Sequence, residues 1–285
     1  MTSVVIACCQ LAPVAGANTL NRGCTEAAVR TAVANGASVV VLPELVSSGY
    51  VVEDKREAFA CAESAEGLTV SSWVRLAAEL DVVVGGFCEV SDGQLFNSAA
   101  LVDVQGLRAL YRKAHLWDSE VNCFASGDAE PPVVDTRFGR ISMMVCYDLD
   151  FPEWVRLAAL RGAQLLCAPT NWPEGPRAVG ATPMETVRIQ ASASVNRLFI
   201  AACDRAGSER GMSWVGASTI VESTGGYWPP PGRRADRYRP SRTLPATSNA
   251  HRVRTWGHAT TSTRIVGRRS TTAWSSDPVA GSDRQ

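Results

Sequence analysis

Histidine and lysine are scarce in this chain of 285 residues. Lysine occurs only as Lys55 and Lys113, and histidine only as His115, His251 and His258. Two of the three histidines lie in an irregular C-terminal stretch, so the sequence has little material for a His-based catalytic triad or a His-rich metal site. The cysteines also lack the Cys-x-x-Cys spacing of a zinc site, and we expect no bound metal.

Long apolar runs and a signal peptide are also missing. No stretch approaches the roughly 20 apolar residues that span a bilayer, and the N-terminus has neither a basic segment nor a small-residue cleavage site. The chain has 9 cysteines, and this odd number fits reduced thiols better than a disulfide framework. These absences predict a cytoplasmic protein that does not bind membranes.

Charge is unevenly distributed, although the formal net charge is zero. Residues 227–285 carry 11 of the 28 basic residues and only 3 of the 28 acidic ones, which leaves residues 1–226 with a net charge of −8. A body this acidic is a poor nucleic-acid binder. The stretch 227–285 is rich in Arg, Pro, Ser and Thr and has no periodicity. We expect it to be a disordered tail rather than a basic arm that binds nucleic acid or membranes.

The first 226 residues alternate short β-branched runs with helical patterns, which predicts one α/β domain. Strands are expected at residues 4–10, 38–42, 82–88, 97–103, 107–112, 139–145, 164–168, 198–203 and 213–221, and helices at 18–35, 68–80, 153–161 and 184–196. Asn18 is the expected N-cap of the first helix and Gly36 its C′ residue. Asp148 is expected to stabilise the N-terminus of the helix at 153–161 through its charge. Turn residues between the strands at 97–103 and 107–112 favour a layered sandwich with some antiparallel pairing over a purely doubly wound sheet.

Three isolated ionisable residues stand at strand ends. Cys146 follows the apolar run 141–145, Glu44 follows Val-Val-Val-Leu-Pro, and Lys113 follows Leu-Tyr-Arg. Taken singly, the cysteine has the ordinary explanation of a buried core thiol, and the two charges that of solvated surface groups. A charge directly after an apolar run, however, needs either solvent or a partner. Together, a carboxylate, an ammonium group and a thiol can form a hydrolytic site.

The motifs that contain these residues resemble those of the nitrilase superfamily of carbon–nitrogen hydrolases, specifically its amidase-like branch. They are Val-Leu-Pro-Glu-Leu-Val-Ser-Ser-Gly-Tyr at 41–50, Tyr-Arg-Lys-Ala-His-Leu-Trp at 111–117 and Cys-Tyr-Asp-Leu-Asp-Phe-Pro-Glu at 146–153. Their order and spacing agree with the family, and the resemblance extends from Val4 to about Gly226. It implies a four-layer α-β-β-α sandwich and a hydrolase without a metal or organic cofactor.

The resemblance also implies a role for each residue. Cys146 is the expected nucleophile, Glu44 the general base and then acid, and Lys113, with the backbone N–H of Tyr147, the group that stabilises the oxyanion. Glu120, seven residues after Lys113, resembles the family's second glutamate, which orients the substrate. An exposed loop acid is the alternative for Glu120. The expected reaction converts a linear, non-peptide amide through a Cys thioester into a carboxylic acid and ammonia.

The sequence indicates the substrate less clearly than it indicates the catalytic residues. Tyr147 after the nucleophile is typical of the amidase-like members and favours amides over nitriles. Leu149 and Asp150 stand where carboxylate-binding relatives place arginines, so we expect a neutral or cationic small-molecule amide. Three residues are expected to bind the substrate: Tyr147, and Asn171 and Trp172 in a loop after a strand. Core packing is the alternative for Trp172.

Alternatives to this reading stay open. One is a nitrilase or N-carbamoyl amidase, and another is a catalytically silent homologue that acts as a binding protein. The family pattern ends after Gly225-Gly226, and a frameshift is a second explanation for residues 227–285. By the same resemblance we expect a homodimer that pairs through helices on one face, where the small residues of Ala191-Ser192-Ala193-Ser194 permit close approach.

Overall fold

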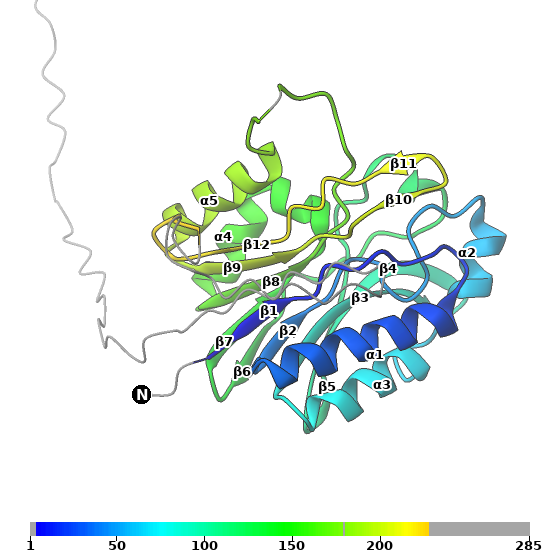
Figure 1. The fold of residues 1–285 in the computed structure, drawn as a ribbon, viewed down its shortest axis with the longest axis horizontal. Coiled ribbons are helices and arrows are strands. Elements are labelled where there is room, and N and C mark those ends of the chain that lie inside the picture. The colour runs from blue at the N-terminus through cyan, green and yellow to red at the C-terminus, as the bar shows by residue number, and fades with distance from the viewer. Residues whose placement is uncertain (1–3, 179, 228–285) are drawn as a thin grey trace, which may run out of the picture.

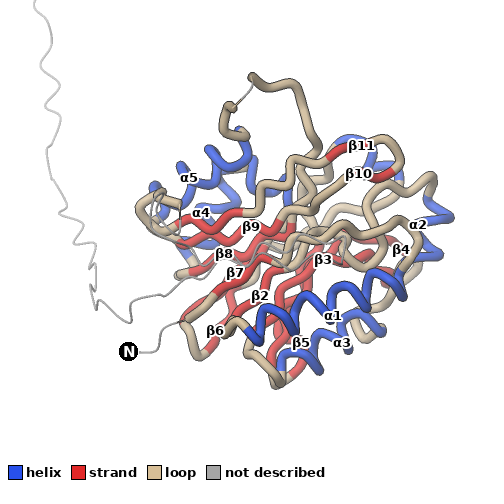
Figure 2. The backbone as a smooth tube through the Cα atoms, in the orientation of Figure 1, coloured by secondary structure: helices blue, strands red, loops and turns tan. Residues whose placement is uncertain are grey.

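The computed structural model describes residues 4–178 and 180–227. Two five-stranded sheets pack face to face, and helices cover the outer face of each sheet (Figure 1, Figure 2). The chain therefore has the four-layer α-β-β-α sandwich predicted from the sequence. Within the described ranges, no helix is long and apolar enough to cross a membrane. The predicted domain boundary at residue 226 stays a prediction, and the predicted tail, apart from Tyr227, lies outside the described residues.

The first sheet has the order β1-β2-β3-β4-β5, with parallel pairing from β1 to β3 and antiparallel pairing from β3 to β5. Its strands are β1 (Ile6–Cys8), β2 (Val39–Val41), β3 (Val82–Ser91), β4 (Gln94–Asp103) and β5 (Gly106–Arg112). All three valines of β2 are fully buried. Burial on both faces explains why this run is continuously apolar rather than alternating.

The second sheet has the order β12-β9-β8-β7-β6, with parallel pairing among β7, β8 and β9. Its strands are β6 (Val133–Thr136), β7 (Gly139–Met143), β8 (Leu165–Pro169), β9 (Phe199–Cys203) and β12 (Thr219–Val221), and a separate hairpin contains β10 (Ser208–Glu209) and β11 (Met212–Ser213). The single strand expected at 213–221 is wrong in its middle. There the backbone N–H of Val215 donates to Trp172 O and that of Ala217 to the Asp204 carboxylate, so this stretch leaves the sheet.

Helices α1 and α3 cover the first sheet, and α4 and α5 cover the second (Figure 1). The helices are α1 (Asn18–Ala34), α2 (Lys55–Cys61), α3 (Leu68–Ala77), α4 (Pro152–Leu160) and α5 (Met184–Asn196). Gly36 follows the C-cap Asn35 with a φ of 82°, which confirms it as the C′ residue of α1. The prediction for Asn18 is wrong, because Ala17 is the N-cap. The Asn18 amide instead donates to Cys61 O at 2.7 Å and joins α1 to α2.

Candidate active site

Glu44 and Lys113 follow strands that terminate at the same end of the first sheet. Glu44 follows β2 and Lys113 follows β5; these two strands run in the same direction, because β2 is parallel to β3 and β5 is reached from β3 through two antiparallel pairings. Gly86 of β3 permits the Glu44 turn to pack closely, since a Cβ at that position would lie 2.6 Å from Glu44 Cα. Both charged side chains are fully buried. The sheet topology therefore brings two groups that are distant in sequence into one apolar setting.

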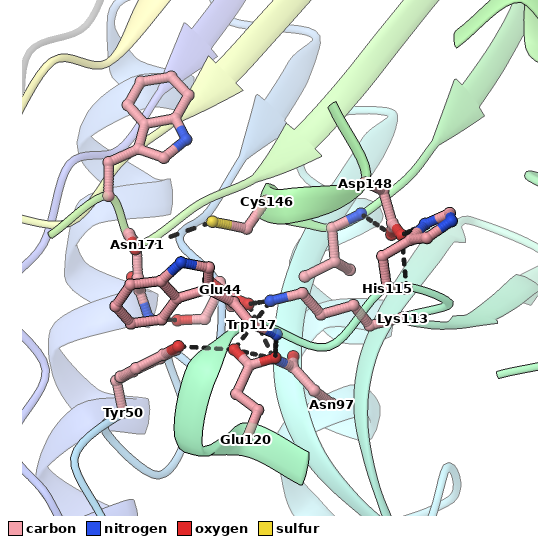
Figure 3. Close-up of polar contacts among 12 residues, drawn as sticks. Glu44, Tyr50, Asn97, Lys113, His115, Trp117, Glu120, Cys146, Asp148 and Asn171 are labelled. Carbon is pink, nitrogen blue, oxygen red and sulfur yellow. Dashed lines mark hydrogen bonds and ion pairs between the residues drawn. The ribbon is translucent and has the colours of Figure 1, made fainter. Parts of the chain in front are cut away.

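Lys113 joins two carboxylates (Figure 3). Its Nζ donates to Glu44 Oε1 at 2.7 Å and to Glu120 Oε1 at 2.8 Å. The Asn97 amide donates to Glu44 at 2.7 Å, and the Tyr50 hydroxyl donates to Glu120 at 2.6 Å. Glu120 belongs to the 3-10 helix η1 (Asp118–Asn122) and is 5% exposed, so the alternative of an exposed loop acid is wrong.

One oxygen of the Glu44 carboxylate, Oε2, is buried and has no hydrogen-bond partner among the described residues, so it is free to accept a proton. Burial raises the pKa of Glu44 to about 7, although attraction to Lys113 opposes this shift. Burial on its own would lower the pKa of Lys113, but attraction to Glu44 and Glu120 outweighs it and holds that pKa above its usual value. Near neutral pH the cluster therefore contains a protonated lysine and a glutamate that exchanges protons readily.

Cys146 begins the 3-10 helix η2 (Cys146–Asp150), and two residues separate it from the end of β7. Its φ of 45° lies in the left-handed region, which residues other than glycine rarely adopt outside functional sites and turns. Its Sγ donates to Asn171 O at 3.7 Å and lies above the Glu44–Lys113 pair in Figure 3. Burial raises the pKa of the thiol well above its usual value; the charge of Glu44 adds to this, and that of Lys113 opposes it. Cys146 is therefore a thiol at rest and needs a base to become a nucleophile.

Asp148 holds the Cys146 turn in place, a role that was not predicted from the sequence. The effect of its charge on the N-terminus of α4 stays a prediction. The fully buried carboxylate accepts hydrogen bonds from the Val145 N–H at 3.1 Å and from the Tyr111 hydroxyl at 2.8 Å. It also accepts from the His115 N–H at 3.0 Å and contacts a His115 ring nitrogen at 2.7 Å. Tyr111 and His115 lie 37 and 33 residues earlier in the chain, so local sequence gives no sign of this role.

A pocket of about 250 Å³ opens beside Cys146. The three predicted substrate-binding residues, Tyr147, Asn171 and Trp172, all line it. Trp172 is 4% exposed and also packs in the core between the sheets, so both interpretations of it apply. The Asn171 amide donates to Glu44 O at 3.0 Å and thereby fastens the loop after β8 to the Glu44 turn. The structure brings these residues together, and their role in substrate binding stays a prediction.

Further residues at the site were not identified from the sequence. Asn97 and Tyr50 hold the two glutamates, and Arg188 of α5 lines the pocket and pairs with Asp150 at 2.5 Å. Tyr50 ends the motif at 41–50 and so had a signal, whereas an Asn in a strand and an Arg on a helix are ordinary residues. No group of three or more His, Cys, Asp or Glu side chains in the part of the chain that the structure describes could hold a metal ion.

Comparisons with known proteins agree with this geometry. The family model for carbon-nitrogen hydrolases matches residues 5–237. A nitrilase of Pyrococcus abyssi is 35% identical over 200 residues, which cover 69% of this chain and 72% of the relative. An (R)-stereoselective amidase of Pseudomonas sp. is 34% identical over 218 residues, 76% of each chain.

Among solved structures, a mutant of the amidase from Nesterenkonia sp. AN1 superimposes with a TM-score of 0.68 at 28% identity, covering 79% of this chain and 84% of that one. In that structure the acetamide moiety of fluoroacetamide is covalently added at the active-site cysteine. The structural comparison supports the fold, and the sequence comparisons relate this chain to known amidases and nitrilases.

Proposed function

The chain belongs to the carbon–nitrogen hydrolase family, in the amidase-like branch of the nitrilase superfamily, and we propose that it hydrolyses a small linear amide through a thioester on Cys146. One observation carries the proposal: a buried thiol lies beside a buried glutamate, Glu44, that has an open oxygen and a pKa of about 7. Such a pair suits attack assisted by a general base near neutral pH. In the Nesterenkonia amidase the active-site cysteine carries the acetamide moiety of fluoroacetamide, which supports by analogy a nucleophilic cysteine at this position.

The first half of the proposed reaction forms the acyl-enzyme. Glu44 takes the thiol proton, and the Cys146 sulfur attacks the amide carbon. The ammonium group of Lys113 and the backbone N–H of Tyr147 stabilise the negative oxygen; one such donor is worth about 10² to 10³ in rate. Glu44 then gives the proton to the leaving nitrogen, the C–N bond breaks, and ammonia departs. Glu120 keeps Lys113 in position through the 2.8 Å ion pair.

The second half releases the acid. Glu44 takes a proton from water, the hydroxide attacks the thioester carbon, and the C–S bond breaks. The sulfur of Cys146 leaves as a thiolate and regains the proton from Glu44, which restores the starting state. The products are a carboxylic acid and ammonia, and each proton transfer at the reacting centre is made by the same glutamate.

The substrate that we propose is small and lacks a carboxylate. A volume of about 250 Å³ is below the range of about 300–1,000 Å³ that is typical of drug-sized ligands. At the two positions after the nucleophile where an arginine would bind a substrate carboxylate, Leu149 is buried and Asp150 lines the pocket with a negative charge. A strong preference for succinamate over butyramide would contradict this choice of substrate class.

Intact mass spectrometry after incubation with a panel of amides tests the thioester. We expect a mass increase equal to the acyl group, and we expect Cys146→Ala to abolish it together with ammonia release. Cys123→Ala is the matched control, because Cys123 is also a free thiol but does not line the Cys146 pocket. Its adduct and its ammonia release should match those of the wild type.

The same assay separates the alternatives when a nitrile and a ureide are added to the panel. Ammonia release mainly from the nitrile would indicate a nitrilase, and release mainly from the ureide an N-carbamoyl amidase. Folded wild-type protein that forms no adduct and turns over none of these compounds would contradict the proposal and favour a silent binding homologue.

A further inference from the structure

The pocket beside Cys146 contains one cation, Arg188, among its lining residues. Arg188 belongs to α5, and its Nη1 donates to Asp150 Oδ1 at 2.5 Å. The two side chains are 39% and 28% exposed, so the pair lies at the wall of the pocket and not in the core. Asp150 ends η2, the element that begins with Cys146. The ion pair therefore stands next to the place where a substrate would be attacked.

The charges around the pocket are few. Besides Arg188, the charged lining residues are Asp150 and Glu185, so the formal net charge of the lining is −1. The other lining residues carry no formal charge. A carboxylate on the substrate would thus meet one guanidinium group that is already paired with an acid, and a second acid close by.

We propose that Asp150 is a specificity-determining residue. Because Asp150 pairs with Arg188, this arginine is not free to bind a substrate carboxylate. The pocket therefore favours amides in which the end opposite the amide group is neutral or cationic. This inference rests on the proposed amide hydrolysis. Arginine binds carboxylates through strong, often bidentate hydrogen bonds. A substrate carboxylate could gain that contact only by displacing Asp150, which would leave an unpaired acid beside Glu185.

Three substrates of similar size test the proposal: butyramide is neutral, succinamate carries a carboxylate, and 3-aminopropanamide carries an ammonium group. The measured quantity is the ratio of kcat/KM for each charged amide to that for butyramide, so a general loss of activity cancels. In the wild type we expect succinamate to be the poorest of the three. In Asp150→Ala we expect the succinamate ratio to rise about tenfold to a hundredfold, because the freed arginine gains a charge-assisted partner.

Two further variants show whether the gain comes from Arg188. The double variant Asp150→Ala, Arg188→Gln should lose the gain and return the succinamate ratio to near its wild-type value. Glu130→Gln is the matched control, because Glu130 pairs with an arginine, Arg161, at the surface and does not line the pocket. All its ratios should equal those of the wild type.

The outcomes separate this proposal from the proposed function. A succinamate ratio that stays within about twofold of the wild type in folded Asp150→Ala would overturn the role of Asp150 while butyramide turnover still supports amide hydrolysis. A gain that persists in the double variant would overturn the role of Arg188. Absence of all turnover by the wild type would overturn both. If thermal melting shows that Asp150→Ala does not fold, the same test is made with Asp150→Asn. We then expect the succinamate ratio to rise in the same direction, but by less.

Discussion

Glu44 carries the proton in both halves of the proposed reaction, so its ionisation sets the pH dependence. Burial raises its pKa to about 7, and only the carboxylate form accepts the Cys146 proton. We expect kcat/KM for butyramide to rise about tenfold per pH unit below about pH 7 and to level off above it. Ammonia release measured from about pH 5 to about pH 9 checks this, and a profile that stays flat through about pH 7 would contradict the assignment of the base.

The same residue should limit stability at high pH. The folded-state pKa of Glu44, about 7, lies above the ordinary value of 4.5, so the folded protein favours the neutral acid. This contribution to stability is fully present below about pH 4.5 and is lost as the pH rises through about 7. We expect Glu44→Gln, which removes the charge, to be inactive but more stable than the wild type at about pH 8, by up to about 3 kcal/mol, with much less difference at about pH 5.

Urea denaturation at the two pH values measures that difference. A variant that is less stable than the wild type at the higher pH would show that the ion pair with Lys113 outweighs the burial cost of the Glu44 charge. The comparison matters because the site holds two carboxylates around one ammonium group, and burying an excess of negative charge costs stability.

The grouping of Glu44, Lys113 and Cys146 was predictable because each interrupts an apolar run inside a recognisable motif, and their catalytic roles stay predictions. Glu120 was also expected at the site, but other supporting residues were not. Asp148 looks like a helix-start acid because Pro152 and Glu153 follow it closely, yet most of its hydrogen bonds come from Tyr111 and His115, over thirty residues away. Arg188 likewise reaches the pocket only because α5 packs against the turn after β7.

At the scale of elements, the loop between β2 and α2 depends on a buried ion pair far along the chain. Glu209 Oε2 accepts hydrogen bonds from the backbone N–H groups of Tyr50 at 2.9 Å and Val51 at 2.7 Å, and from Arg205 Nη1 at 2.9 Å. The Arg205 and Glu209 side chains are 1% and 6% exposed. The small hairpin of β10 and β11 thus positions Tyr50, whose hydroxyl in turn holds Glu120.

Glu209→Gln should therefore destabilise the protein and impair the site. We expect a loss of about 3 kcal/mol in the free energy of unfolding, because a buried guanidinium group is left without its counter-charge. Glu79→Gln is the control: its pair with Arg30 is exposed, so we expect a change of less than about 1 kcal/mol. Chemical denaturation of the two variants checks this, and equal losses would show that burial does not set the strength of the Glu209 pair.

Elements were predicted best where a long run is buried or clearly periodic, as for β3, β4, α1 and α5. Two short elements without a clear apolar run, α2 and β6, were not predicted. The helix α2 has only 7 residues, and its start depends on the Asp54 side chain, which accepts a hydrogen bond from the Glu57 N–H. The strand β6 has 4 residues and follows Pro131-Pro132, which read as a loop. Elements of this length carry too few residues to show a period, so tertiary packing decides them.

At the scale of the whole molecule, the outer face of α5 carries an apolar stripe. Met184, Val187, Ala191 and Val195 recur every three or four residues along the helix and are all exposed, with Val195 73% exposed. Such spacing places them on one helical face. The expected set of small contact residues is partly wrong, because Ala193 is fully buried inside the chain. The exposed apolar surface that α5 offers to a partner is therefore the stripe that contains Ala191.

We propose that this stripe pairs with its copy in a homodimer. Val195→Glu should shift the protein from dimer to monomer in size-exclusion chromatography with light scattering, because an unpaired charge in an apolar interface is costly.

Val104→Glu is the matched control: Val104 is 66% exposed in the turn between β4 and β5, away from α5, and its charge should leave the mass unchanged. A monomeric wild type, or a dimer that survives Val195→Glu, would contradict pairing through α5. An isologous contact uses the same surface of both copies, so the single substitution places a charge in the interface twice, once from each protomer, and should act strongly.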